Sequence, residues 1–155
     1  MTKTRRVAAM TACVTVLLGA GGPAALARRD VGPNTGPAGP CSLTRGASET
    51  IQDFSARQIT CAADTWAVPG GADRAICIAD RESGLVPTAS SPTGAYLGLF
   101  QHSATYWPSR YDTWTKAEWH LRTSALNGRT NAIVTLRMVH AIGRWATAGW
   151  PAKGC

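Results

Sequence analysis

Apolar residues recur at helical spacing from residue 48 to residue 66, in the stretch SETIQDFSARQITCAADTW. Side chains three or four positions apart share one face of an α-helix, so this spacing predicts an amphipathic helix. Ser48 is available as its N-cap, and the Pro-Gly-Gly sequence at 69–71 predicts its end. The apolar face consists of Ile51, Phe54, Ile59, Ala62, Ala63 and Trp66.

A second, shorter helix is predicted by ADRAICIADRESG, at 72–84. Asp73 lies near its start, and Gly84 is expected to end it. The short connection between the two predicted helices indicates an antiparallel hairpin about Pro69 and Gly70. Its apolar face consists of Ala75, Ile76, Ile78 and Ala79.

The segment 86–105 lacks helical periodicity and predicts a loop or a small hairpin. Within it, Ser91–Gly94 (SPTG) has proline second and glycine fourth, which is typical of a type I turn. A last helix is predicted within 127–145, and its wide apolar face indicates that it is the buried, central one. That face contains Ile133, Val134, Leu136, Met138, Val139, Ala141, Ile142 and Trp145. The pattern therefore predicts a mainly helical domain with a loop-built cleft after the second helix.

The N-terminus has the pattern of a secretory signal peptide over 1–27. A short basic start precedes an apolar run that ends in small residues at Ala25–Ala27. A membrane anchor is the alternative, but the run falls short of about 20 apolar residues. Residues 28–47 are rich in Gly and Pro and predict a flexible leader. The processed chain is then a secreted domain that begins near residue 48.

Charge and residue spacing exclude several classes of function. Without the signal peptide the chain keeps 13 of its 16 basic residues against 9 acidic ones, a formal charge of +4. A mild positive charge suits an anionic polymer such as a cell wall, and no Lys/Arg block indicates nucleic-acid binding. His102, His120 and His140 are far apart in sequence and no cysteine pair has zinc-site spacing, so we expect neither a metal nor another cofactor.

Four cysteines remain after signal removal, an even number that predicts two disulfides in an exported chain. Three pairings are possible. Cys61 and Cys77 lie at nearly equal distances from the turn of the predicted helical hairpin, which favours a Cys61–Cys77 bridge. Cys41 would then pair with Cys155, closing a long loop that stabilises the fold by about 4 kcal/mol.

Glu82 is the residue with the clearest candidate chemistry. It follows Ile78 by four positions and Ala79 by three, so it continues the apolar face of the second helix. Desolvation and the negative end of the helix dipole both raise a carboxyl pKa. A glutamic acid that stays protonated at a cleft edge suits general-acid cleavage of a glycosidic bond. The alternative is a solvated glutamate at a helix end.

The stretch Arg81–Gln101, RESGLVPTASSPTGAYLGLFQ, resembles the signature of the soluble lytic transglycosylase family, within the lysozyme-like superfamily. The signature runs Glu-Ser, a spacer, Ala-x-Ser, Gly-Ala and Gly-Leu-x-Gln. The stretch 131–145 is similar, more weakly, to the Asn-led third motif of secreted bacterial members, so the resemblance covers about 61–150. The matching signature residues are Glu82, Ser83, Ala89, Ser91, Gly94, Ala95, Gly98, Leu99 and Gln101.

The resemblance implies a lysozyme-like α+β domain over 48–155 that acts on peptidoglycan glycan strands as a monomer. It implies that Glu82 is the catalytic acid and that Asn131 begins the helix flooring the glycan cleft. Met138 stands where the third motif commonly has tyrosine, so a hydroxyl near the glutamate would have to come from elsewhere. Tyr96, Tyr106 and Tyr111 are the candidates. The residues expected to bind the glycan are Ser91, Gly94, Gln101, Tyr106 and Asn131.

Three functions remain open at this stage. A lytic transglycosylase needs one acid, whereas a hydrolase needs a second carboxylate about 5 to 9.5 Å away. Asp112 and Glu118 are the only later acids and lie in a polar stretch, which favours lytic cleavage over muramidase hydrolysis. A non-catalytic wall-binding or signalling module on the same fold is the third possibility. Trp107 and Trp114 are equally good candidates for sugar stacking and for core packing.

Overall fold

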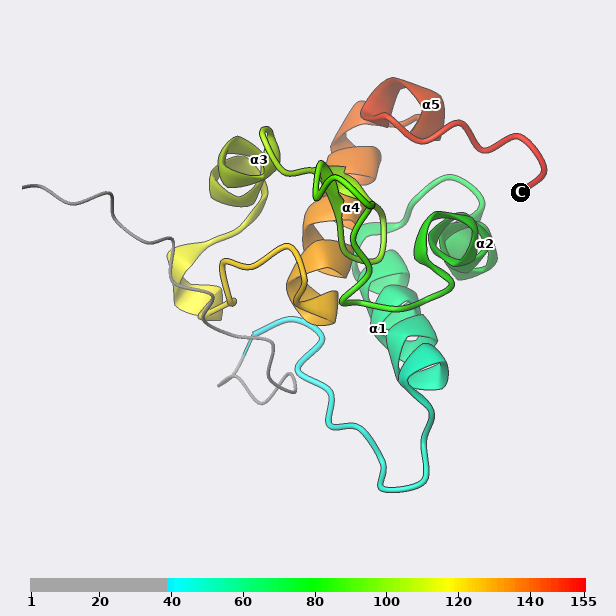
Figure 1. Ribbon diagram of the computed structural model, residues 1–155, viewed down its shortest axis with the longest axis vertical. Helices are drawn as coiled ribbons and strands as arrows, with labels where there is room; N and C mark the ends of the chain where they lie inside the picture. Colours follow the sequence, from blue (N-terminus) through cyan, green and yellow to red (C-terminus); the bar gives the residue numbers. More distant parts are fainter. Residues whose placement is uncertain (1–38) are drawn as a thin grey trace, which may run out of the picture.

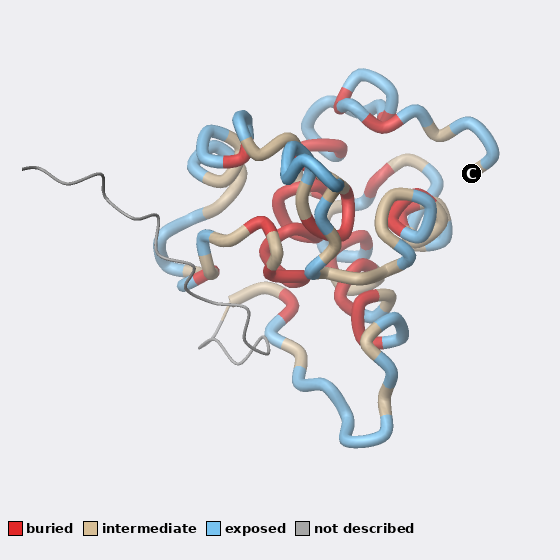
Figure 2. The backbone as a smooth tube through the Cα atoms, viewed as in Figure 1, coloured by how far each residue is buried: buried red, intermediate tan, exposed pale blue. Residues whose placement is uncertain are grey.

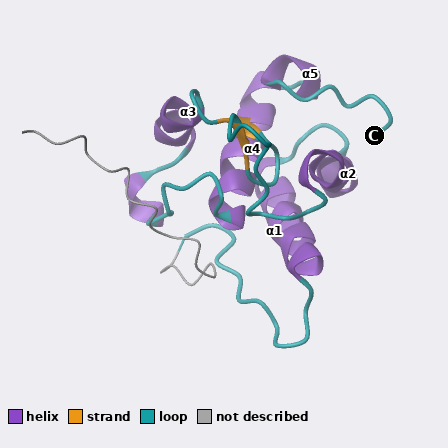
Figure 3. Ribbon diagram, in the orientation of Figure 1, coloured by secondary structure: helices purple, strands orange, loops and turns teal. Residues whose placement is uncertain are grey.

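The computed structural model describes residues 39–155, so the predicted signal peptide and residues 28–38 of the leader lie outside the described residues. Within 39–155 the chain is mainly helical, with one two-stranded sheet (Figures 1 and 3). No helix of this part is long and apolar enough to cross a membrane. The elements are α1 (Ile51–Trp66), α2 (Gly71–Ser83), β1 (Tyr96–Leu97), β2 (His102–Ser103), α3 (Trp107–Trp114), the 3-10 turn η1 (Ala117–Trp119), α4 (Gly128–Ile142) and α5 (Trp145–Ala148).

The two predicted N-terminal helices are confirmed as a packed pair, α1 and α2. The N-cap of α1 is Thr50 and not Ser48: its hydroxyl accepts a hydrogen bond from the Asp53 backbone N–H at 3.0 Å. A left-handed Ala67 ends α1, and the left-handed Gly84 ends α2 as expected. Apolar periodicity and the glycine and proline stop signals therefore located both helices, and only the N-cap of α1 was misplaced.

Helix α4 is the central helix, as its wide apolar face indicates. All its residues are buried except Arg137, His140, Ala141 and Ile142, and it runs through the buried middle of the domain (Figure 2). The prediction was wrong at its C-terminal end, because Gly143 takes a left-handed conformation, with φ 75°, and stops the helix. Trp145 belongs to the separate short helix α5, where its indole is buried.

The loop after α2 contains the small hairpin that the sequence allowed. The backbone N–H of Gly94 donates to the Ser91 carbonyl at 2.8 Å, which confirms a turn at Ser91–Gly94. β1 and β2 pair antiparallel, with Leu97 opposite His102. The hairpin lies against the central helix α4, because the side chain of Asn131 on α4 accepts from the Phe100 backbone N–H at 3.0 Å.

The four cysteines form two disulfides, but the predicted pairing was wrong. Cys41 bonds to Cys61 and Cys77 bonds to Cys155. Buried apolar side chains such as Ala62 and Ile78 fill the interface between α1 and α2. Cys61 and Cys77 are therefore at the edges of this interface and only partly buried. There they meet segments without regular structure, which approach to Cα–Cα separations of 5.7 and 5.8 Å.

Residues 39–47, the described part of the predicted leader, form no helix or strand but contact the domain at several points. Cys41 is buried, Arg129 of α4 donates to the Pro40 carbonyl, and Arg57 of α1 donates to the Thr44 carbonyl. Arg57 also forms an ion pair with Glu49. This part of the chain is therefore attached to α1 and α4.

The two disulfides are expected to contribute differently to stability. They span 20 and 78 residues, and the loop-entropy relation gives about 3 kcal/mol for Cys41–Cys61 and about 4.5 kcal/mol for Cys77–Cys155. Replacing each pair by serine and measuring urea unfolding should therefore show the larger loss for the second pair. An equal or reversed order would mean that native contacts, and not unfolded-chain entropy, determine the effect.

Candidate functional site

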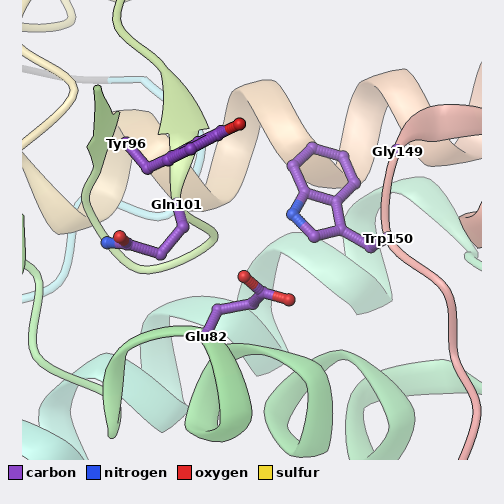
Figure 4. Close-up of a pocket in the computed structure, with 5 residues that line it drawn as sticks. All are labelled: Glu82, Tyr96, Gln101, Gly149 and Trp150. Carbon is purple, nitrogen blue, oxygen red and sulfur yellow. The ribbon is translucent and has the colours of Figure 1, made fainter. Parts of the chain in front are cut away.

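An open cavity of about 300 Å³ lies between α2, the hairpin and the segment that follows α5. Figure 4 shows Glu82 on one side, with Tyr96 and Gln101 of the hairpin and Trp150 of the C-terminal segment around it. Gly149 completes the lining. Segments far apart in sequence thus surround one carboxylate.

Glu82 occupies the last turn of α2, where its side chain is half-buried and faces the cavity. Burial raises the pKa of its carboxyl, and the positive charge of the adjacent Arg81 opposes this shift. The Arg81 guanidinium is directed to the Lys153 carbonyl, to which it donates a hydrogen bond. The carboxyl also stands at the negative end of the helix dipole, which favours its neutral form. Glu82 is thus suited to hold a proton.

The raised pKa of Glu82 predicts how this residue affects stability. A carboxyl with a higher pKa in the folded chain stabilises the fold fully below its unfolded pKa of about 4.3, and this contribution is lost as the pH rises through the folded pKa. Glu82→Gln removes the titration, so we expect the variant to unfold at a higher temperature than wild type at about pH 7. Thermal unfolding followed by circular dichroism should show this gain shrink toward about pH 3.5. A gain independent of pH would contradict the assignment.

Tyr96 begins β1, and Gln101 is the last residue of the connection between β1 and β2. Tyr96 is 53% exposed, and its backbone N–H donates to the Ser91 hydroxyl at 3.1 Å. Gln101 has a left-handed backbone, with φ 46°, and its side-chain nitrogen donates to the Gly98 carbonyl at 2.9 Å. Tyr96 therefore brings a phenol to the cavity, whereas the Gln101 nitrogen is already engaged within the loop.

Trp150 lines the cavity although the sequence analysis missed it. It is 4% exposed, and its indole N–H donates to the Phe100 carbonyl at 2.6 Å. Its ring also meets the edges of Phe100 and His102, with centroids 6.0 and 5.0 Å apart. Its sequence signal was weak, because a tryptophan between a glycine and a proline after the last helix has no periodicity.

The tryptophans considered for sugar stacking pack inside the protein. Trp107 is 6% exposed and donates its indole N–H to the Thr123 carbonyl. Trp114 is partly buried against both apolar clusters of the core. Neither lines the cavity, so the packing alternative is the one observed.

Asn131 is fully buried and does not line the cavity. It lies one turn inside α4, whose N-cap is Asn127 and not Asn131. Its side-chain oxygen accepts from the Phe100 N–H, and its nitrogen donates to the carbonyls of Ala125 at 2.9 Å and Leu97 at 3.4 Å. Asn131 thus holds the hairpin on α4 and acts on the site through the backbone of Leu97 and Phe100.

The other predicted binding residues do not line the cavity. Ser91 and Gly94 form the turn beneath Tyr96. Tyr106 is 61% exposed at the start of α3, and Tyr111 donates its hydroxyl to the Leu121 carbonyl. Met138 is buried in the main apolar cluster. Of the three tyrosines considered, Tyr96 alone lines this cavity.

Among residues 39–155, Glu82 is the only carboxylate that lines this cavity. Asp112 on α3 and Glu118 in η1 are both exposed and outside it. In the described part of the chain, no group of three or more His, Cys, Asp or Glu side chains is placed to hold a metal ion. The chemistry of the site therefore depends on one carboxyl group, one phenol, one amide and one indole.

His102, behind the cavity, is a buried neutral residue. Arg110 donates to its Nδ1 at 2.9 Å, so Nε2 carries the proton and faces the Thr135 hydroxyl at 2.8 Å. Burial, together with the charge of Arg110, lowers the pKa of His102 to about 3. The His102 ring therefore stays neutral near pH 7 and supports the hairpin through its two hydrogen bonds.

Comparison with known protein families, with curated proteins and with solved structures found no match for this chain. Its function is therefore argued from the residues and the geometry of this site.

Proposed function

We propose that this chain is a lysozyme-like enzyme that cleaves the β-1,4 bond between N-acetylmuramic acid and N-acetylglucosamine in bacterial peptidoglycan. The observation that carries the proposal is Glu82, the single carboxylate that the described part of the chain brings to the cavity, whose pKa is raised by burial. General acids for glycoside cleavage need this property, because they must be protonated before the reaction. The resemblance of Arg81–Gln101 to the lytic transglycosylase signature supports the same role.

In the proposed reaction Glu82 first acts as an acid and then as a base. Its proton passes to the glycosidic oxygen, the bond from that oxygen to C1 of N-acetylmuramic acid breaks, and the N-acetylglucosamine end leaves. The Glu82 carboxylate then takes the proton of the sugar's own 6-hydroxyl, whose oxygen bonds to C1. The product is a 1,6-anhydro sugar, no water is consumed, and Glu82 ends protonated.

The lining of the cavity favours this route over hydrolysis. A hydrolase of the usual type places two carboxyl groups about 5 to 9.5 Å apart across the bond. Asp112 and Glu118 are exposed and outside the cavity, so neither lines it opposite Glu82. Tyr96 stands on the hairpin side of the cavity with Gln101, where its phenol is available to a sugar.

The remaining sequence features fit a protein that acts in the cell wall. We propose that residues 1–27 direct export and that the secreted chain, with a formal charge of +4, meets an anionic wall polymer. The two disulfides are typical of chains that fold outside the cytosol.

The test is digestion of purified peptidoglycan followed by mass spectrometry of the released fragments. We expect 1,6-anhydro-muropeptides, which are lighter by one water than hydrolytic products. Reducing ends in their place would identify a hydrolytic muramidase. Binding to peptidoglycan without any release would identify a non-catalytic wall-binding module.

A further inference from the structure

The last six residues, 150–155, connect the two sides of the cavity. We call this segment the C-terminal brace. It follows the short helix α5, contains no helix or strand and runs to a point beside α2 (Figure 1). Its first residue, Trp150, lines the cavity, and its last, Cys155, is bonded to the helix that bears Glu82.

The hairpin side of the brace is attached through Trp150. Its indole N–H donates to the Phe100 carbonyl, and its ring packs against the His102 ring. The guanidinium of Arg110 lies 5.7 Å from the centroid of Trp150 and donates to His102. Because Phe100 precedes Gln101 directly, this attachment reaches the backbone of a cavity-lining residue.

The other end of the brace is attached to α2. Cys155 forms the disulfide with Cys77, and the Cys155 carbonyl accepts from Arg74 Nε at 3.2 Å. Arg81 donates to the Lys153 carbonyl. Three successive turns of α2 therefore hold the end of the brace, and the last of them includes Glu82.

We propose that the C-terminal brace fixes the width of the cavity, with Trp150 as a positioning residue, so that substrate binding requires the Cys77–Cys155 disulfide to be intact. This inference rests on the proposed function of Glu82. It adds a dependence of the site on one particular disulfide.

The disulfide is the strongest of the attachments to α2. The arginine contacts are made at a partly exposed surface, where hydrogen bonds and charges compete with water. Most of the brace between its ends is exposed: Pro151, Lys153 and Gly154 are exposed, and only Ala152 is partly buried. Without the disulfide, residues 151–155 are expected to open locally at low cost, which leaves Trp150 held only by its own contacts with the hairpin and Arg110.

The Cys41–Cys61 disulfide provides a matched control. It joins the segment before α1 to α1 itself, and neither cysteine lines the cavity. Replacing it by serine also removes a covalent loop and destabilises the fold, but leaves both ends of the brace attached. A difference between the two double variants therefore reports on the brace and not on stability in general.

The first test measures hydrogen exchange at the indole N–H of Trp150 by NMR in the full processed chain. We expect exchange to be at least about tenfold faster in Cys77→Ser/Cys155→Ser and unchanged within about twofold in Cys41→Ser/Cys61→Ser. Equal protection in wild type and in the Cys77→Ser/Cys155→Ser variant would overturn the proposal. This readout does not depend on catalysis, so it can be interpreted even if the chain cleaves no glycan.

The second test measures steady-state cleavage of soluble peptidoglycan fragments by the same variants. A wider cavity positions the glycan poorly, so we expect kcat/KM to fall at least about tenfold in Cys77→Ser/Cys155→Ser, mainly through KM. The control variant should stay within about twofold of wild type. A loss of the same size in both variants would overturn the role of the brace while leaving the role of Glu82 intact.

A milder variant covers the case in which the serine variants fail to fold. Arg74→Met removes one hydrogen bond to the brace, about two turns from Glu82, and keeps both disulfides. We expect a two- to threefold rise in KM with kcat unchanged and faster exchange at Trp150, on the order of the loss of one part-buried hydrogen bond. No change in either quantity would contradict the attachment of the brace to α2 through Arg74.

Discussion

Glu82→Gln is expected to lower kcat for peptidoglycan cleavage by about 10²- to 10⁴-fold, the range that general acid–base catalysis supplies. Glutamine keeps the size and much of the hydrogen bonding of glutamate but has no proton to transfer at neutral pH. The half-buried position at the end of α2 is expected to accept it without loss of stability. The measurement is kcat and KM on soluble fragments, with KM expected to change little.

Asp80→Asn is the matched control for this variant. Asp80 lies two residues earlier on the same helix, is exposed and does not line the cavity. The change makes the same replacement of a carboxyl group by an amide on α2 but outside the cavity, so activity should stay within about twofold of wild type. If Glu82→Gln keeps more than about a tenth of wild-type kcat, another group supplies the proton and the proposed mechanism is wrong.

Gly98→Ala is expected to destabilise the fold by about 2–5 kcal/mol. Gly98 has φ 78°, which costs a residue with a Cβ about 1–2 kcal/mol. The added Cβ would also overlap the Ala125 carbonyl and the Asn131 side-chain amide, and overpacking of this kind costs about 1–3 kcal/mol more. Asn131 hydrogen-bonds to the backbone of Leu97 in β1 and of Phe100 in the connection to β2. Relief of the overlap therefore requires the hairpin to move away from α4.

The variant Gly94→Ala separates the cost of the positive φ from the cost of the steric overlap. Gly94 also has a positive φ, 71°, but an added Cβ would meet nothing within 4 Å. We therefore expect a loss of about 1–2 kcal/mol at this position. Urea unfolding with an unchanged m-value would measure both losses. Equal losses in the two variants would mean that contact between the hairpin and α4 contributes little to stability.

The positions of α1, α2, α4 and the turn after α2 follow from local spacing and were predicted correctly, whereas the N-cap of α1 and the end of α4 were not. The apolar face of α2 located Glu82 on its inner side, and the structure places that carboxyl half-buried at the cavity. The turn at Ser91–Gly94 followed from its proline and glycine, and the central position of α4 from its wide apolar face. These features depend on residues within a few positions of one another.

Predictions that depended on distant parts of the chain were wrong or incomplete. The Cys61–Cys77 bridge was predicted from the geometry of the two N-terminal helices, whereas each of these cysteines bonds to a cysteine outside both helices. Asn131 was expected at the glycan cleft, but it is buried and bonds the hairpin backbone 31 residues earlier in the sequence. Trp150 was missed, because its place beside Glu82 depends on contacts with Phe100 and on the bridge at Cys155.

The sequence by itself determined α1, α2 and the central α4, most of their buried faces and the one carboxyl group with a reason to hold a proton, because helical periodicity, turn chemistry and the position of Glu82 on α2 are local properties. It did not predict α3 or α5. Only the tertiary structure decided which side chains surround that carboxyl group. Tyr96, Gln101 and Trp150 meet it because the hairpin packs on α4 and the C-terminal segment is bonded to α2. Those contacts join residues far apart in the chain, and no pattern within a short window encodes them.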